Sequence, residues 1–199
     1  MKPAPREPDR AKRWLAFLRN QREAIAAMDF FTVPTITVAV LYCFFIISHD
    51  RRRILHVNVT KHPTSAWIIQ QLREAFPFEA SHKYLIFDRD QKFGIEVIAA
   101  LKATGILPKQ TSFRSPWQNG IAERWVGSCR RELLDHIVAL NERHLKRLLG
   151  EYVRYHHEDR THLGLEKATP DGRMRSVASG RVLAQERLGG LHHRYDRAA

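Results

Sequence analysis

Three runs of apolar residues lie in the first third of this chain, and their composition is that of buried β-strands. Val, Ile, Phe and Tyr are frequent in them. The polar sequence His-Asp-Arg-Arg between the second and third runs fits a hairpin turn. The runs occupy residues 26–33, 37–48 and 53–60. We therefore predict three consecutive antiparallel strands at the start of the fold.

The apolar spacing then becomes helical, and helices alternate with short strands. Thr64 is expected to cap a helix that runs through Phe76 and is stopped by Pro77. Gly105 is expected to end a second helix. Helices are predicted at residues 13–27, 64–76, 95–104, around Glu123 to about 134, and 141 to about 157, with strands at 84–88 and 108–113. Such an order predicts an α/β fold.

Lysine and arginine outnumber aspartate and glutamate, which gives the chain a net charge of +12. The excess is spread along the sequence, as expected for a protein that lies along a polyanion such as DNA. An ordinary solvated surface is the alternative interpretation. A hydrophobic fraction of 44% is sufficient for a real core.

Nothing in the sequence favours export or membrane insertion. The longest apolar run, residues 36–47, is shorter than the roughly 20 residues that span a bilayer. The proline-rich N-terminus lacks the apolar core of a secretory signal. Two cysteines, Cys43 and Cys129, supply neither a disulfide framework nor a zinc ligand set. We therefore expect a protein of a reducing cytoplasm.

Three carboxylates are the candidates for chemistry. Asp29 lies inside an apolar run, Asp88 closes the apolar sequence Tyr-Leu-Ile-Phe, and Glu123 follows the sequence Ser-Pro-Trp-Gln-Asn-Gly. A carboxylate at the end of a buried strand is costly unless it is paired or bound to a cation. Oxygen ligands of this kind suit Mg²⁺ or Mn²⁺, and two such ions can stabilise both the attacking and the leaving oxygen of a phosphoryl transfer.

These residues carry a resemblance to a known family. Between Asp88 and Glu123 lie 34 residues, Phe93 follows Asp88 by five positions, and Ala-Glu-Arg follows the loop sequence closely. In these features the chain resembles the catalytic core of the integrase and transposase superfamily, most closely bacterial insertion-sequence transposases, over about residues 25–173. Where the family usually has glycine, this chain has Asp90. Asp90 is therefore the alternative to Asp88 as the second metal-binding acid.

The resemblance implies a ribonuclease-H-like fold with a mixed five-stranded sheet and flanking helices. It implies that Asp29, Asp88 and Glu123 hold two Mg²⁺ or Mn²⁺ ions and that the protein cleaves and joins DNA strands as a homo-oligomer on DNA ends. It also implies a protein of the bacterial cytoplasm that is associated with the nucleoid when it is bound to DNA. We therefore expect three parts in the chain. Residues 1–24 form a basic N-terminal extension, residues 25–173 form the catalytic core, and residues 174–199 form a basic tail that we expect to be flexible.

The same segment contains the candidates for DNA contact. They are Trp117, Gln118, Asn119, Arg124, Arg130 and Arg131. Trp117 fits either stacking on a base or packing beneath the loop, and packing is slightly favoured. Gly127 and Arg130 share a helix face with Glu123, where glycine leaves room for close approach. For Arg130 and Arg131 a solvated helix surface is an equal alternative.

Other polar clusters are better explained by structure than by chemistry. His156, His157 and His162 are expected to pack rather than to bind metal, because adjacent histidines on a helix point in different directions. His192 and His193 are expected to be solvated. The arginines of residues 51–53 are expected in the polar hairpin turn.

Two other functions compete with a transposase. About 28 residues precede Asp29, fewer than the helix-turn-helix region that such transposases usually place upstream. A truncated, non-catalytic DNA-binding remnant is therefore the first alternative, and a ribonuclease-H-like nuclease without a role in transposition is the second. The sequence has no phosphate-binding glycine loop and no Ser-His-Asp motif, which argues against nucleotide-triphosphate enzymes and hydrolases of that type.

Overall fold

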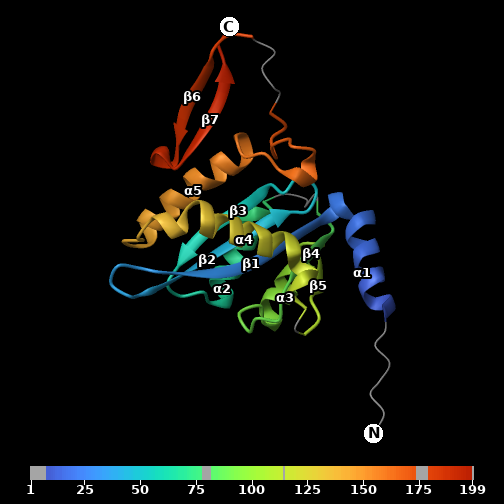
Figure 1. Ribbon diagram of the computed structural model, residues 1–199. Helices are drawn as coiled ribbons and strands as arrows, with labels where there is room; N and C mark the ends of the chain where they lie inside the picture. The colour runs from blue at the N-terminus through green and yellow to red at the C-terminus, as the bar shows by residue number, and fades with distance from the viewer. Residues whose placement is uncertain (1–7, 78–81, 114, 174–178, 199) are drawn as a thin grey trace.

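A mixed five-stranded sheet forms the centre of the molecule, with strand order β3-β2-β1-β4-β5. The computed structural model describes residues 8–77, 82–113, 115–173 and 179–198 (Figure 1). The strands are β1 (Ile25–Pro34), β2 (Val40–Ser48), β3 (Ile54–Thr60), β4 (Tyr84–Phe87) and β5 (Leu107–Gln110). The first three strands are antiparallel, whereas β4 and β5 run parallel to β1. The predicted mixed sheet with flanking helices is confirmed.

Helices cover both faces of this sheet (Figure 1). They are α1 (Pro8–Asn20), α2 (Ser65–Ala75), α3 (Ile95–Ala103), α4 (Gly120–Glu132) and α5 (Glu142–Glu158). Thr64 caps α2 as predicted, since its side chain accepts a hydrogen bond from the amide of Trp67 at 3.2 Å. Gly105 follows α3 with a φ of 80°, a left-handed conformation that favours glycine.

The alternation of side chains along β1 divides the core into two layers. Ile25 and Ala27 face α4 and α5, whereas Ala26 and Met28 face α2 and α3. Both cysteines are free and belong to the first layer: Cys43 of β2 and Cys129 of α4 are fully buried there. The layer between the sheet and α4 is therefore well packed, which fixes the helix that carries Glu123.

The predicted helix at residues 13–27 was misplaced. The observed helix α1 ends at Asn20, and Ile25 already belongs to β1, where it pairs with Tyr84 of β4. Residues 1–7 lie outside the described residues. The N-terminal extension nevertheless contacts the core, because Phe17 packs edge-on against Tyr84 at 5.1 Å between ring centroids.

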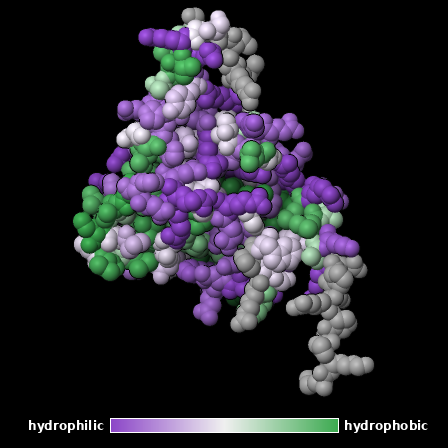
Figure 2. All heavy atoms as spheres, in the orientation of Figure 1, coloured by the Kyte–Doolittle hydropathy of each residue, from purple (hydrophilic) through white to green (hydrophobic). Residues whose placement is uncertain are grey.

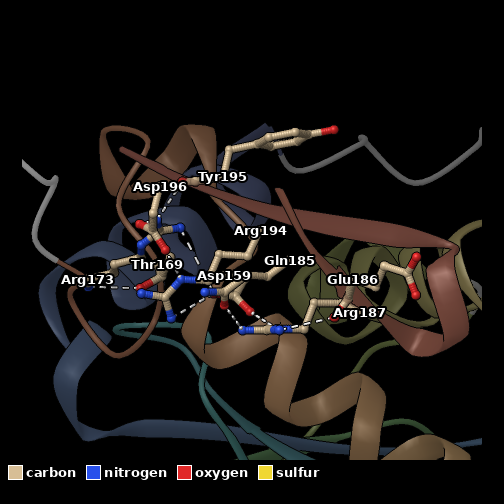
Figure 3. A network of polar contacts seen from close by, with 9 residues as sticks. All are labelled: Asp159, Thr169, Arg173, Gln185, Glu186, Arg187, Arg194, Tyr195 and Asp196. Carbon is tan, nitrogen blue, oxygen red and sulfur yellow. Dashed lines mark hydrogen bonds and ion pairs between the residues drawn. The ribbon is translucent and has the colours of Figure 1, made fainter. Parts of the chain in front are cut away.

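The C-terminal segment was expected to be flexible, but much of it forms an antiparallel hairpin of β6 (Val182–Arg187) and β7 (His192–Arg197). Most side chains of this hairpin are exposed or half-buried, so apolar packing contributes little to holding it. Electrostatic contacts to Asp159, at the end of α5, hold it instead (Figure 3). Residues 174–178 and 199 lie outside the described residues.

Asp159 is the centre of a network that joins three segments (Figure 3). Its side chain is only 1% exposed. One carboxylate oxygen accepts a hydrogen bond from Arg187 at 2.7 Å, and the other lies 3.4 Å from Arg194 and 3.9 Å from Arg173. Arg173 and Arg194 both also pair with Asp196. Asp159 thus links the hairpin to the core, together with His192, which stacks on Tyr155 and lies 2.9 Å from the carbonyl of Glu132.

The surface of the protein is largely hydrophilic in the view of Figure 2, with the broadest apolar area at the left and smaller ones at the right and near the top. Part of this apolar character comes from the turn between β1 and β2, where Ile36 and Val38 are 63% and 82% exposed. No helix in the described part of the chain combines the length and apolar character that crossing a bilayer requires.

Candidate active site

The pairing of β1 with β4 brings two of the predicted acids to the same level of the sheet. Ala27 is opposite Ile86 in the parallel ladder, so Asp29 and Asp88 each lie two residues further along neighbouring strands. Adjacent strands are about 4.8 Å apart, and residues two apart point to the same face. That face is the one covered by α4, because Ala27 packs in the layer beneath this helix.

Glu123 approaches the same face of the sheet from the first turn of α4. Trp125 anchors this turn in the core: its ring centroid lies 4.3 Å from that of Phe45 and 5.8 Å from that of Phe31. Glu123 itself is exposed. The buried tryptophan therefore fixes the helix, while Glu123 on the helix surface presents an exposed carboxylate.

Gln118 and Asn119 were predicted to contact DNA, but the structure places both side chains inside, with exposures of 6% and 2%. The Gln118 side-chain oxygen accepts a hydrogen bond from the amide of Ser112 at 2.6 Å. The Asn119 Nδ2 donates to the carbonyl of Met28, the residue before Asp29, at 3.4 Å. Asn119 therefore ties the start of α4 to β1, and Gln118 ties it to the segment after β5. This arrangement does not support direct contact of either side chain with DNA.

The electrostatic environment of Asp29 links the acids. Burial raises the pKa of Asp29 from 3.8 to about 7, and the hydrogen bond from the amide of Phe30 works against this increase. The negative charges of Asp88, Glu123 and Asp90 raise the pKa further, in that order of importance. Asp29 is therefore half-protonated near neutral pH and lies in the negative field of the other acids.

Asp88 and Asp90 differ in how far they are already engaged. Asp88 Oδ1 accepts a hydrogen bond from the amide of Asp90 at 2.9 Å, which forms a tight turn after β4. Asp90 Oδ2 instead pairs with Lys92 Nζ at 2.7 Å. The charge of Asp90 is thus partly neutralised, and its effect on Asp29 is smaller than that of Asp88. This difference favours Asp88 as the second acid.

Asp29, Asp88 and Glu123 are residues of the type that binds a hard divalent cation, although their side chains do not converge on one point in the structure. Within the described ranges, no three histidine, cysteine, aspartate or glutamate side chains are grouped closely enough to hold a metal ion as they stand. All three candidates nevertheless offer carboxylate oxygens, the ligands that Mg²⁺ and Mn²⁺ prefer. An added cation would relieve the repulsion that raises the pKa of Asp29.

The arginines predicted to bind DNA are exposed on α4, as contact with a phosphate requires. They are Arg124, Arg130 and Arg131. Arg130 reaches across to β1: its Nη2 donates to the carbonyl of Thr32 at 3.3 Å, and its guanidinium lies 6.0 Å from the Phe31 ring centroid. DNA binding by all three stays a prediction.

Two sequence interpretations near α4 need revision. Trp117 is 46% exposed, so it does not pack beneath its loop as slightly favoured, and stacking on a base remains open to it. The room expected beside Gly127 is occupied by the same helix: a Cβ atom there would lie 3.1 Å from Nη1 of Arg131.

The histidine cluster at the C-terminal end of α5 makes structural contacts, as the sequence indicated. His157 Nε2 accepts a hydrogen bond from the amide of Ile54 at 2.8 Å, and His156 Nε2 lies 3.1 Å from the carbonyl of Arg52. Burial lowers the pKa of His156 to about 3, so its imidazole is neutral. In contrast to expectation, His192 is not simply solvated, because its ring stacks on Tyr155 at 4.7 Å between centroids.

Two residues near the site were missed in the sequence. Lys92 pairs with Asp90 and also lies over the rings of Phe30 and Tyr42, at 5.7 and 5.3 Å from their centroids. Lys92 follows Asp90 by two residues, and this spacing could have indicated the ion pair between them. Trp14 donates a hydrogen bond from Nε1 to the carbonyl of Gln118 at 3.2 Å. No local signal in the sequence predicts such a contact between distant segments.

Comparison with known proteins places this arrangement in context. Residues 104–170 match the family model of the integrase core domain. No curated protein sequence is detectably similar to the chain.

The fold is similar to those of several solved structures. One is a chain of the simian T-cell lymphotropic virus intasome in complex with PP2A regulatory subunit B56 gamma, with a TM-score of 0.61 and 14% identity over 88% of this chain and 67% of that chain. Another is the Mos1 transposase catalytic domain with raltegravir and Mg, with a TM-score of 0.60 and 12% identity over 73% and 79%. A third is the catalytic core domain of BIV integrase, with a TM-score of 0.54 and 15% identity over 75% and 91%.

These similarities confirm the predicted ribonuclease-H-like fold and the predicted resemblance to integrase and transposase catalytic cores.

Proposed function

We propose that this chain is the catalytic core of a transposase or integrase that cleaves and joins DNA strands, with Asp29, Asp88 and Glu123 as its catalytic and metal-binding residues. The observation that carries the proposal is the state of Asp29. Its pKa is raised to about 7 by burial and by the charges of Asp88 and Glu123. A buried acid in the field of two further acids is the environment in which a cation binds favourably.

The three acids would hold Mg²⁺ or Mn²⁺, and we propose two ions. When bound, such ions polarise the phosphoryl oxygens, activate water or a DNA 3′-hydroxyl and stabilise the leaving oxygen. The presence of Mg with the Mos1 catalytic domain supports this choice of metal. Asp88 could bind a cation through Oδ2 while Oδ1 keeps its hydrogen bond from the amide of Asp90, and Glu123 is free to move because it is exposed.

The protein's own residues supply the remaining requirements of the reaction. Asp29 must lose its proton before it can bind a cation, so the pKa of about 7 makes the site sensitive to pH near neutrality. Arg124 and Arg130 on the outside of α4 would hold the phosphate backbone near Glu123. Trp117, half-exposed on the preceding loop, would stack on a base.

DNA is the proposed partner, and we propose that the protein acts as a homo-oligomer on DNA ends. The net charge of +12 supports binding to a polyanion. Size-exclusion chromatography with light scattering, with and without duplex DNA, tests the assembly. A single copy on each DNA end in all conditions would contradict it.

The remnant that binds DNA without catalysis is the competing function, and it finds less support. The described residues include all five strands of the central sheet together with α4 and its Glu123. A nuclease without joining activity is the other competitor, and the products of the reaction distinguish the two activities.

The decisive experiment is a strand-joining assay with pre-nicked DNA ends and Mg²⁺ or Mn²⁺. Glu123→Gln should abolish the products, because it keeps the size of the side chain but removes a charge that the cation requires. Glu96→Gln is the matched control, because Glu96 is an exposed glutamate in the first turn of α3. Activity that survives Glu123→Gln would reject the mechanism, and an inactive wild-type protein that still binds metal would favour the remnant.

A further inference from the structure

A cavity of about 480 Å³ lies beside α4, between this helix, the turn from β2 to β3 and the segment after α5. Arg124 and Arg131 line it from α4, Arg52 from the turn, and Arg160 from the segment after α5. No aspartate or glutamate of the described chain is among its lining residues. Arg124 is next to Glu123 in the sequence, so the cavity opens about a quarter turn around the helix from this acid.

Among the residues that the structure describes, one of these four guanidinium groups has a carboxylate partner. Arg160 forms a two-pronged pair with Glu132 at 2.7 to 3.0 Å. For Arg52, Arg124 and Arg131, the described residues provide no ion pair. We call the cavity formed around these three residues the arginine pocket.

No acidic side chain in the described part of the chain lines the arginine pocket, so its walls carry positive charge alone. Burial lowers the pKa of Arg52, and every charged group that affects this pKa is another arginine, namely Arg124, Arg22 and Arg160. Cations held together in a half-buried cavity repel one another, and this repulsion is removed when an anion binds among them.

The backbone conformation at Arg52 and at Gly164 determines where the Arg52 side chain lies. Arg52 has a φ of 59°, in the left-handed region that is unfavourable for a residue with a side chain. Its guanidinium lies so close to Gly164 that a Cβ atom there would be 1.9 Å from Arg52 Nη2. Glycine at this position therefore makes room for the guanidinium in the wall of the pocket.

Buried polar atoms of the wall also have no hydrogen-bond partner. Nε of Arg52 is one of them, and Nε2 of His162 is another. His162 is only 5% exposed, and it lines the pocket. Buried donors of this kind are costly unless a ligand or water satisfies them.

We propose that the arginine pocket binds a phosphate group, and that this phosphate belongs to the DNA backbone. Guanidinium groups offer pairs of parallel N–H donors that match the oxygens of a phosphate, and three of them surround a tetrahedral anion better than a planar carboxylate. The assignment to DNA rests on the proposed function, because the same helix carries Glu123 next to the pocket. Binding of a phosphate group does not depend on that function.

The first test is a titration of the full chain with inorganic phosphate at constant ionic strength. The chain has four tryptophans, and the indole N–H of Trp125, which lines the pocket, is the reporter in two-dimensional NMR. Comparison with Trp125→Phe assigns its signal. We expect a saturable shift in the wild-type protein and a loss of affinity of at least about tenfold in Arg52→Gln, which removes one charge-assisted contact.

Two variants distinguish phosphate binding in the arginine pocket from a general effect of the net charge of the protein. Gly164→Ala should weaken phosphate binding as strongly as Arg52→Gln, because it displaces the Arg52 guanidinium without changing the net charge. Arg143→Gln removes a charge from an exposed position on α5 outside the pocket and should bind phosphate like the wild-type protein. If Arg52→Gln does not fold, Arg131→Gln at the exposed end of the pocket serves in its place.

The second test identifies the source of the phosphate through the salt dependence of binding to duplex DNA. Loss of one phosphate contact should make the log–log slope shallower by about 0.9 in Gly164→Ala and leave it unchanged in Arg143→Gln. Phosphate binding with an unchanged slope in Gly164→Ala would support the pocket and assign it to a free phosphate compound. No saturable shift in the wild-type protein, or an equal loss in Arg143→Gln, would overturn the proposal. Glu123→Gln should lose strand joining but keep phosphate binding, so the two proposals fail separately.

Discussion

Replacement of Asp29 by asparagine should stabilise the protein without metal, and increasingly so as the pH rises. The pKa of Asp29 is about 7 in the folded chain against an ordinary value of 3.8. Between these values the folded chain binds a proton that the unfolded chain has released, so the free energy of unfolding decreases as the pH rises. Asparagine carries no such proton, and its side-chain oxygen can still accept the hydrogen bond from the amide of Phe30.

The size of the effect follows from the shift in pKa. Each pH unit contributes about 1.4 kcal/mol, so the ionised Asp29 costs at most about 4 kcal/mol above pH 7, of which about 3 kcal/mol develops between pH 5 and pH 8. At pH 8 the unfolding free energy of Asp29→Asn should therefore exceed that of the wild-type protein by up to about 4 kcal/mol. Near pH 4 the difference between the two proteins should be small.

Urea unfolding at several pH values in the presence of EDTA measures the effect. The difference between variant and wild-type protein cancels the contribution of the buried histidines, which are the same in both. Asp135→Asn is the matched control, because Asp135 is an exposed aspartate away from the sheet, and it should show no such pH dependence. Addition of Mg²⁺ at pH 8 should stabilise the wild-type protein but not Asp29→Asn. Parallel pH profiles of the unfolding free energy for the wild-type protein and Asp29→Asn would refute the raised pKa of Asp29.

Three further predictions follow from other contacts. Asp88→Asn should abolish strand joining, whereas Asp90→Asn should keep most of it, because Lys92 already neutralises Asp90; the reverse result in the same assay would exchange the two roles. Affinity for duplex DNA should decrease steeply with salt, by about 0.9 in log–log slope for each phosphate contact, with little dependence on sequence. A flat response in fluorescence anisotropy would contradict this expectation. Asp159→Asn should loosen the C-terminal hairpin, since removing one partner of a buried ion pair costs about 3–5 kcal/mol. Hydrogen exchange should then accelerate at residues 182–197 and stay unchanged in the central sheet; equal protection in both proteins would show that other contacts hold the hairpin.

The strands and helices of the central part could be predicted because their apolar residues follow the periods of the elements. Thr64 also marks the start of α2 by its own chemistry, since it caps the helix. The helix at residues 13–27 was predicted too long because alanine favours helices locally. Ile25 and its neighbours belong to β1 instead, because pairing with β2 and β4 outweighs the local preference of alanine for a helix.

Features that depend on long-range polar contacts could not be predicted in this way. Gln118 and Asn119 lie in a polar loop, and only the backbone groups of Ser112 and Met28 account for their burial. The C-terminal hairpin has no apolar face that a pattern could indicate, because buried Asp159 and its arginines hold it. The three acids could be proposed as candidates from the sequence, and their catalytic role stays a prediction. The common level of Asp29 and Asp88 depends on the register of two strands, which the sequence does not give.

The two cysteines between the sheet and α4 allow the opening of this helix to be timed. Cys43 and Cys129 are fully buried, and burial raises the pKa of both thiols. A thiol reagent reacts with the solvent-accessible thiolate, so both cysteines should be inert for as long as the helix is seated. The rate of modification in excess reagent therefore reports how often the helix that carries Glu123 lifts from the sheet. Because the native thiols are protected, a cysteine introduced on the surface can also receive a fluorescent label selectively.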